Sequence, residues 1–204
     1  YEFIGRIVST LIAFGGSVVL ARILGPDYYG LAYALIALPQ SLVSLVDLGL
    51  NGVITRYGSR NEWDTAIAAA FLRFLLVLAM TLVFLLLSKF FAYAFNRPYI
   101  IKYMSIVTLY FFAYSLVTMM ETIVGALGLF HIINAILIIR TIVRVSIAIT
   151  LALLGFGAIS VVWGLVVSYL FEMLALLSIA IYKLRIYIIK VFSDLQNLVQ
   201  GIRK

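Results

Sequence analysis

The sequence contains no cysteine and a single histidine, His131. Without cysteine there is neither a disulfide framework nor a thiolate metal site, and one histidine cannot build a multi-histidine site. The segment "GFGAIS" shares only two glycines with the dinucleotide-binding fingerprint and follows an expected helix, so it predicts no nucleotide site. The chain also lacks a Walker motif. We therefore expect no metal, no cofactor and no enzymatic activity.

Charge is scarce as well. Only 11% of the residues are charged and 65% are hydrophobic, and the mean hydropathy is +1.18. A soluble core of this length cannot hide so much apolar surface, so the chain belongs in a bilayer. Charge-free stretches approach or exceed the roughly 20 residues that a membrane-spanning helix needs. They cover residues 7–21, 28–46, 74–88, 103–120, 122–139 and 145–171.

These stretches predict an all-α integral membrane protein with six transmembrane helices. Five of the expected helices cover residues 3–24, 28–56, 98–128, 131–154 and 160–183, and the third runs from a cap region at 61–64 to about residue 93. Gly25-Pro26 ends the first, Pro39 kinks the second, Asn61 and Asp64 cap the third, and Pro98 opens the fourth. Residues 1–184 would then form one six-helix unit, and residues 185–204 a cytoplasmic tail.

The chain carries a formal net charge of +7 and has a pI near 9.7. Such a charge is compatible with nucleic-acid binding, but the basic residues lie mainly beside the expected spans. The positive-inside rule explains them better, so we expect no nucleic acid and both termini on the cytoplasmic side of the cell membrane. Apolar residues at helical spacing in the tail predict an amphipathic helix, with a connector into further sequence as the alternative.

Charges inside the membrane are costly and point to function. Counting residues outward from each expected turn places Glu121 level with Arg140 on neighbouring antiparallel helices. The same count places Arg144 near the depth of Glu172. It also places Asp47 level with Arg73. The sequence thus predicts three pairs of opposite charge.

Arg140 and Arg144 are four residues apart and share one face of a helix. Two guanidinium groups on one face match phosphate geometry and favour a binding role. The alternative is that the charges only neutralise each other and lock the helices together. For Asp47 and Arg73, nearer the inner end, the structural role is favoured.

Residues 20–60 carry a recognisable series of short motifs. These are Ala21-Arg22 with Leu24-Gly25-Pro26, Tyr29-Gly30, Asp47-Leu48-Gly49-Leu50 and Thr55-Arg56. In this order and spacing they resemble the start of the lipid-linked oligosaccharide flippases, the polysaccharide transporter family of the superfamily that also holds the multidrug and toxic-compound extruders. The resemblance implies a fold of two six-helix lobes around a central cavity, of which this chain matches the first. A second lobe is then expected in the full-length protein.

The resemblance also implies a function. Such proteins move undecaprenyl- or dolichyl-pyrophosphate-linked sugars from the cytoplasmic to the outer leaflet without hydrolysing ATP, so the expected partners are membrane lipids and a lipid-linked oligosaccharide. Arg22, Arg140 and Arg144 are the candidates for phosphate contacts. The charge partners, which would hold or release these arginines and couple movement to protons or sodium, are Asp47, Arg73, Glu121 and Glu172.

Two other functions stay open. A multidrug-type cation antiporter of the same superfamily would have an acidic cavity. A non-transporting membrane scaffold subunit would have every charge paired and no cavity.

Overall fold

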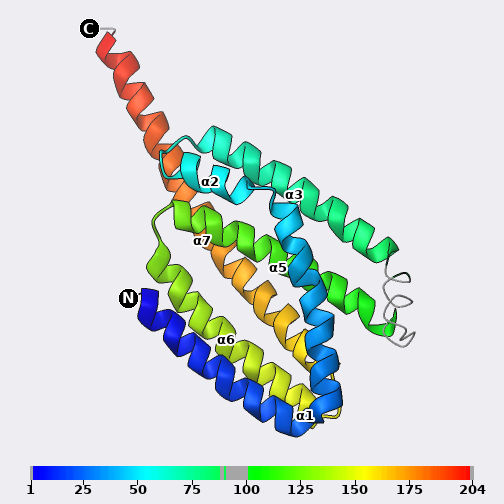
Figure 1. Cartoon of the computed structure of the whole chain (residues 1–204). Helices are drawn as coiled ribbons and strands as arrows, with labels where there is room; N and C mark the ends of the chain where they lie inside the picture. Colours follow the sequence, from blue (N-terminus) through cyan, green and yellow to red (C-terminus); the bar gives the residue numbers. More distant parts are fainter. Residues whose placement is uncertain (1, 88–89, 91–100, 203–204) are drawn as a thin grey trace.

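The computed structural model describes the backbone of residues 2–87, 90 and 101–202, and the side chains of residues 5–37, 39–44, 46–87, 90 and 103–183. Within these ranges the chain is helical and contains no strand (Figure 1). The helices are α1 (Glu2–Asp47), α2 (Leu50–Gly58), α3 (Trp63–Leu86), α5 (Ile101–Ala126), α6 (Phe130–Leu153) and α7 (Ile159–Ile202). The all-α prediction is confirmed.

Helix α1 turns sharply at Gly25, where the sequence predicts a helix end. Gly25 has φ 74° and ψ 170°, a backbone conformation that side chains other than glycine rarely allow. The two arms of α1, residues 2–24 and 26–47, therefore form a V in Figure 1. Five helical stretches of the described chain are long and apolar enough to cross a membrane, and the first of them, Gly5–Ser44, contains both arms. The arms correspond to the first two expected spans.

The second helix was predicted to be continuous from residue 28 to residue 56, and this prediction is wrong. Helix α1 ends at Asp47, and both Leu48 (φ 43°) and Gly49 (φ 80°) are left-handed before α2 begins. The Asp47 carboxylate accepts a hydrogen bond from the Asn51 backbone N–H at 3.1 Å, which caps the new helix and compensates for the break. The expected cap of the next helix also differs, because Glu62 precedes α3 and Asn61 lies in the turn with φ 63°.

Glycines allow α6 to be packed tightly from both sides. A Cβ atom on Gly16 of α1 would lie 2.6 Å from both Cγ atoms of Val145, and one on Gly164 of α7 would lie 2.8 Å from the carbonyl oxygen of Arg144. Gly5 similarly faces Asn134. The first arm of α1 and α6 therefore run parallel, with residue 5 beside 134 and residue 16 beside 145.

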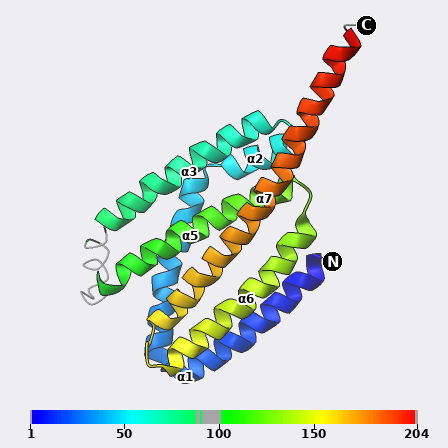
Figure 2. The same cartoon turned by 180° about the vertical axis from the view of Figure 1, so that it is seen from behind.

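Helix α7 continues without interruption past residue 184, and its C-terminal part projects beyond the other helices (Figures 1 and 2). The tail side chains on which the amphipathic prediction rests lie outside the described residues. So do Pro98 and the end of the expected third helix at residue 93.

Candidate functional site

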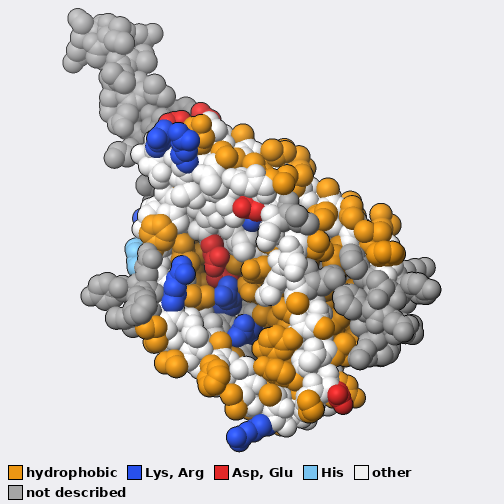
Figure 3. All heavy atoms as spheres, viewed as in Figure 1, with side chains coloured by type: hydrophobic (Ala, Val, Ile, Leu, Met, Phe, Trp, Pro, Cys, Tyr) orange, Lys and Arg blue, Asp and Glu red, His pale blue; other side chains and the backbone are white. Residues whose placement is uncertain are grey.

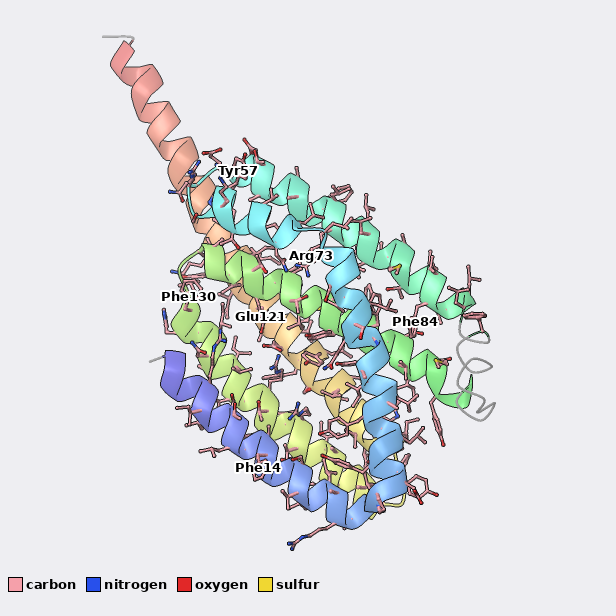
Figure 4. The ribbon with its side chains drawn as sticks, in the orientation of Figure 1. Phe14, Tyr57, Arg73, Phe84, Glu121 and Phe130 are labelled. Atoms are coloured by element: carbon pink, nitrogen blue, oxygen red, sulfur yellow. The ribbon has the colours of Figure 1, made fainter. Side chains whose placement is uncertain are left out.

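Three charged side chains from three helices meet in the interior of the bundle. Nη1 of Arg140 on α6 donates to Oε2 of Glu172 on α7 at 2.6 Å, and lies 3.9 Å from Oε1 of Glu121 on α5. Figure 3 shows basic and acidic side chains gathered in the middle of a largely hydrophobic face. In Figure 4, Glu121 lies inside the bundle beside α6. We call Glu121, Arg140 and Glu172 the charge triad.

Burial differs within the charge triad. Glu172 is 0% exposed, whereas the Glu121 side chain is 31% exposed. Arg140 stacks over the ring of Tyr169, with its guanidinium carbon 4.9 Å from the ring centroid. Oε1 of Glu172 is buried without a hydrogen-bond partner among the described residues. The predicted approach of Glu121 and Arg140 is confirmed, but Glu172 is the nearer partner.

The predicted pairing of Arg144 with Glu172 is wrong in this structure. The close approach of Gly164 to Arg144 and Ala148 sets the antiparallel register of α6 and α7, and it places Glu172 level with residues 136–140. This register brings Arg140 to Glu172, while Arg144 forms no ion pair with any described side chain. Instead Arg144 lines a cavity together with Tyr33 and Tyr169.

Arg144 lines a cavity of about 270 Å³, which we call the arginine cavity. Its polar lining also includes Ser17, Tyr33, Gln40 and Tyr169, and apolar side chains of α1, α6 and α7 complete the wall. Behind this wall Gln40 donates to the hydroxyl of Tyr110 at 3.1 Å, and Tyr110, Tyr114 and Tyr169 pack ring against ring. The ring of Tyr169 thus joins this aromatic cluster to the cavity that Arg144 lines without a carboxylate partner.

A second, larger cavity of about 630 Å³ has Glu121 of the charge triad in its lining, and we call it the hydroxyl cavity. Arg6 also lines it, as do seven hydroxyl- or amide-bearing side chains. These are Ser9, Thr10, Asn51, Thr55, Thr118, Thr122 and Asn134. Most of the hydroxyl groups donate to carbonyls of their own helix, which leaves their oxygens as acceptors towards the cavity. Sequence reasoning missed this cavity, although Ser9-Thr10 and Asn51 are polar positions at the ends of apolar runs.

Asp47 and Arg73 form the third predicted pair, and it is confirmed at 3.6 Å. Arg73 is 1% exposed and also donates to the side chains of Asn51 and Thr118, the latter at 2.9 Å. Figure 4 shows Arg73 at the junction of α1 and α2. The pair therefore ties the break between these helices to α3 and α5, as the structural interpretation predicts.

Arg22 is not brought together with the other two candidate arginines. It is exposed and lies three residues before the turn at Gly25. The parallel register of α1 and α6 places Arg22 level with Leu151, roughly 10 Å beyond Arg144 along the helix axis. Arg22 lines neither cavity.

One comparison with known proteins gives a match. The family model for "Polysaccharide biosynthesis protein" matches residues 19–200. Comparisons with curated proteins and with solved structures give no match. The matched range begins shortly before the motif series and includes both cavities' α5, α6 and α7 walls.

Proposed function

The chain belongs to the polysaccharide biosynthesis protein family, and on that premise we propose that it forms the first lobe of a flippase for lipid-pyrophosphate-linked oligosaccharides. One observation carries the proposal: Arg144 faces the arginine cavity at membrane depth without a carboxylate partner.

An unpaired guanidinium group inside a membrane is costly, and the cost is recovered when an anion binds. Arginine suits a phosphate because its planar fork donates two parallel hydrogen bonds. The hydroxyl groups of Tyr33 and Tyr169 line the same cavity and supply further donors. A pyrophosphate group therefore fits the arginine cavity chemically.

The hydroxyl cavity supports the sugar part of the proposal. Its acceptor oxygens suit the many hydroxyl donors of a glycan, and its volume of about 630 Å³ lies in the range of ligand-binding pockets. Both cavities adjoin the charge triad, since Glu121 lines one, and Tyr169, over whose ring Arg140 stacks, lines the other. A headgroup with an anionic and a polyhydroxylated part matches this arrangement.

The same observations disfavour the two other functions. A cation antiporter needs an acidic cavity, but Arg144 is the charged residue that lines the arginine cavity. A scaffold subunit needs neither cavities nor an unpaired arginine. We further propose that a second lobe completes the central cavity, that both termini are cytoplasmic, and that two alternately open states move the headgroup.

Reconstitution of the full-length protein into proteoliposomes tests the proposal. A lipid-linked oligosaccharide is placed in one leaflet, and the arrival of its sugar in the other leaflet is measured with a membrane-impermeant glycosidase. Arg144→Gln should lower the rate about tenfold or more, because it removes charge-assisted hydrogen bonds of about 1.5–3 kcal/mol. Arg144→Lys should recover part of the rate, since it keeps the charge but loses the fork.

Arg60→Gln is the matched control, because Arg60 is exposed in the turn between α2 and α3. It should transport at the wild-type rate. If Arg144→Gln is as abundant and as active as Arg60→Gln, Arg144 does not bind the substrate and the proposal fails.

A further inference from the structure

We propose that Glu121 and Glu172 form a proton-binding site and that the bound proton controls the hold of these carboxyl groups on Arg140. Proton binding by the pair is argued from the charge triad alone. The consequence for Arg140 rests on the proposed function.

The first argument is the charge balance of the triad. Two carboxyl groups share a single guanidinium nitrogen, at 2.6 Å and 3.9 Å. Both carboxyl groups therefore lie beside the same end of the Arg140 side chain. With both carboxyl groups ionised, the triad carries one uncompensated negative charge in a poorly solvated site, where two neighbouring carboxylates repel. One bound proton makes it neutral.

The second argument is the unpartnered oxygen of Glu172. This side chain is 0% exposed, and its Oε1 has no hydrogen-bond partner among the described residues. A buried polar atom without a partner is costly, and more so when it is charged. Protonation removes the charge of one carboxyl group and allows its O–H to donate to the other.

The third argument is the difference in access. Glu121 is 31% exposed and lines the hydroxyl cavity, whereas Glu172 is sealed behind it. A hydronium ion in that cavity can transfer its proton to a Glu121 oxygen. One O–H bond of the hydronium ion breaks, one carboxyl O–H bond forms, and a water molecule remains. The proton then passes to Glu172 across the contact between the two carboxyl groups.

The surroundings of the pair agree with this direction of transfer. Glu172 is fully buried whereas Glu121 faces the hydroxyl cavity, which leaves Glu172 as the resting place of the proton. The other charged or titratable groups near the pair are Arg140 of α6, which contacts both carboxyl groups, and Tyr169 of α7, whose ring lies under the Arg140 guanidinium group. Asp47 and Arg73 bind each other and are not among the groups that act on the pair.

Proton binding then changes the availability of Arg140. A neutral carboxyl group holds a guanidinium group less strongly than a carboxylate does. Arg140 lies one helical turn from Arg144, so its release places a second guanidinium group beside the arginine cavity. Under the proposed function, protonation of the pair strengthens binding of the pyrophosphate, and deprotonation weakens it.

Infrared spectroscopy of the full-length protein in lipid nanodiscs tests the proton directly. A C=O stretching band of a protonated carboxyl group should be present at neutral pH and should shift on labelling with ¹³C-glutamate. Glu172→Gln should remove this band, and so should Glu121→Gln, because the single remaining carboxylate then pairs one to one with Arg140. Glu62→Gln is the control and should retain the band, since Glu62 is exposed before α3.

Two outcomes would overturn the inference. The first is the absence of the band from the wild-type protein at neutral pH, or its presence there in both Glu121→Gln and Glu172→Gln. The second is loss of the band on addition of sodium at constant pH, which would mean that the pair holds a metal ion. The readout needs no transport, so a failed flippase proposal leaves the band in place, and an absent band leaves the Arg144→Gln result unaffected.

Discussion

Arg140 and Arg144 lie one helical turn apart on α6 but differ in their charged neighbours. Arg140 contacts two carboxyl groups, and Arg144 contacts none among the described side chains. Two arginines on one face of the helix thus divide into one that is held by protein and one that is open to a ligand. Their substitutions should therefore have different effects.

Arg140→Gln should destabilise the protein. It leaves the fully buried Glu172 without its cation, and breaking a buried ion pair in this way costs about 3–5 kcal/mol. Abundance in the membrane and the thermal unfolding midpoint in detergent both report the loss. Adding Glu172→Gln should restore most of the stability, and Glu121→Gln should restore less. Equal stability of Arg140→Gln and Arg144→Gln would contradict this assignment.

Asp47→Asn should lower the free energy of unfolding by a few kcal/mol. An asparagine keeps an oxygen that can accept from the Asn51 backbone, but Arg73 loses its counter-charge while 1% exposed. Thermal unfolding of the variant would be compared with Asp64→Asn, because Asp64 is exposed on the first turn of α3. A similar midpoint for both variants would show that the pair does not stabilise the junction of α1 and α2.

Gly16→Ala should destabilise the packing of α1 on α6, whereas Gly15→Ala should not. The added methyl group at residue 16 would lie 2.6 Å from both Cγ atoms of Val145, a stiff side chain, and such overpacking costs about 1–3 kcal/mol. At residue 15 no atom lies within 4 Å, and alanine is the better helix former. Comparing the thermal unfolding midpoints of these two variants isolates the contact between residue 16 and Val145. A lower midpoint for Gly15→Ala than for Gly16→Ala would contradict the register.

Ser59→Cys and Asp27→Cys should be labelled from opposite sides of the membrane. Both residues are exposed: Ser59 lies in the turn after α2, and Asp27 lies at the start of the second arm of α1. The chain has no native cysteine to interfere. A membrane-impermeant maleimide should reach Ser59→Cys from the cytoplasmic side, as the positive-inside rule predicts. Labelling of both positions from one side would reject the topology.

Counting residues from each turn predicted two of the three charge pairs and missed the third by one helical turn. It predicted that Asp47 meets Arg73 and that Glu121 meets Arg140, because helix rise per residue is constant. The same count selected Arg144 as the partner of Glu172, whereas the structure pairs Glu172 with Arg140. The exact centre of the turn between α6 and α7 sets this register, and it cannot be located from the sequence; in the structure the close packing of Gly164 on Arg144 fixes it.

The break at Leu48 and Gly49 was also not predicted. An apolar run through these residues resembles a continuing helix, and a left-handed leucine has no signal in hydropathy. The signal that exists is chemical. Asp47 precedes Gly49 and Asn51 at the spacing of a helix cap, and a capping interpretation of Asp47 would have ended α1 there.

The parallel pairing of the first arm of α1 with α6 imposes an order on biogenesis. The ribosome completes Gly16 long before Val145, so the first arm must remain in the lipid without its later neighbour. Residues 7–21 carry no charge and can do so. Arg140, in contrast, is synthesised after Glu121 and before Glu172. The partially exposed Glu121 is therefore the first of the two partners of Arg140 to be inserted into the bilayer. The closer contact of Arg140 with Glu172 forms only after α7 has been inserted.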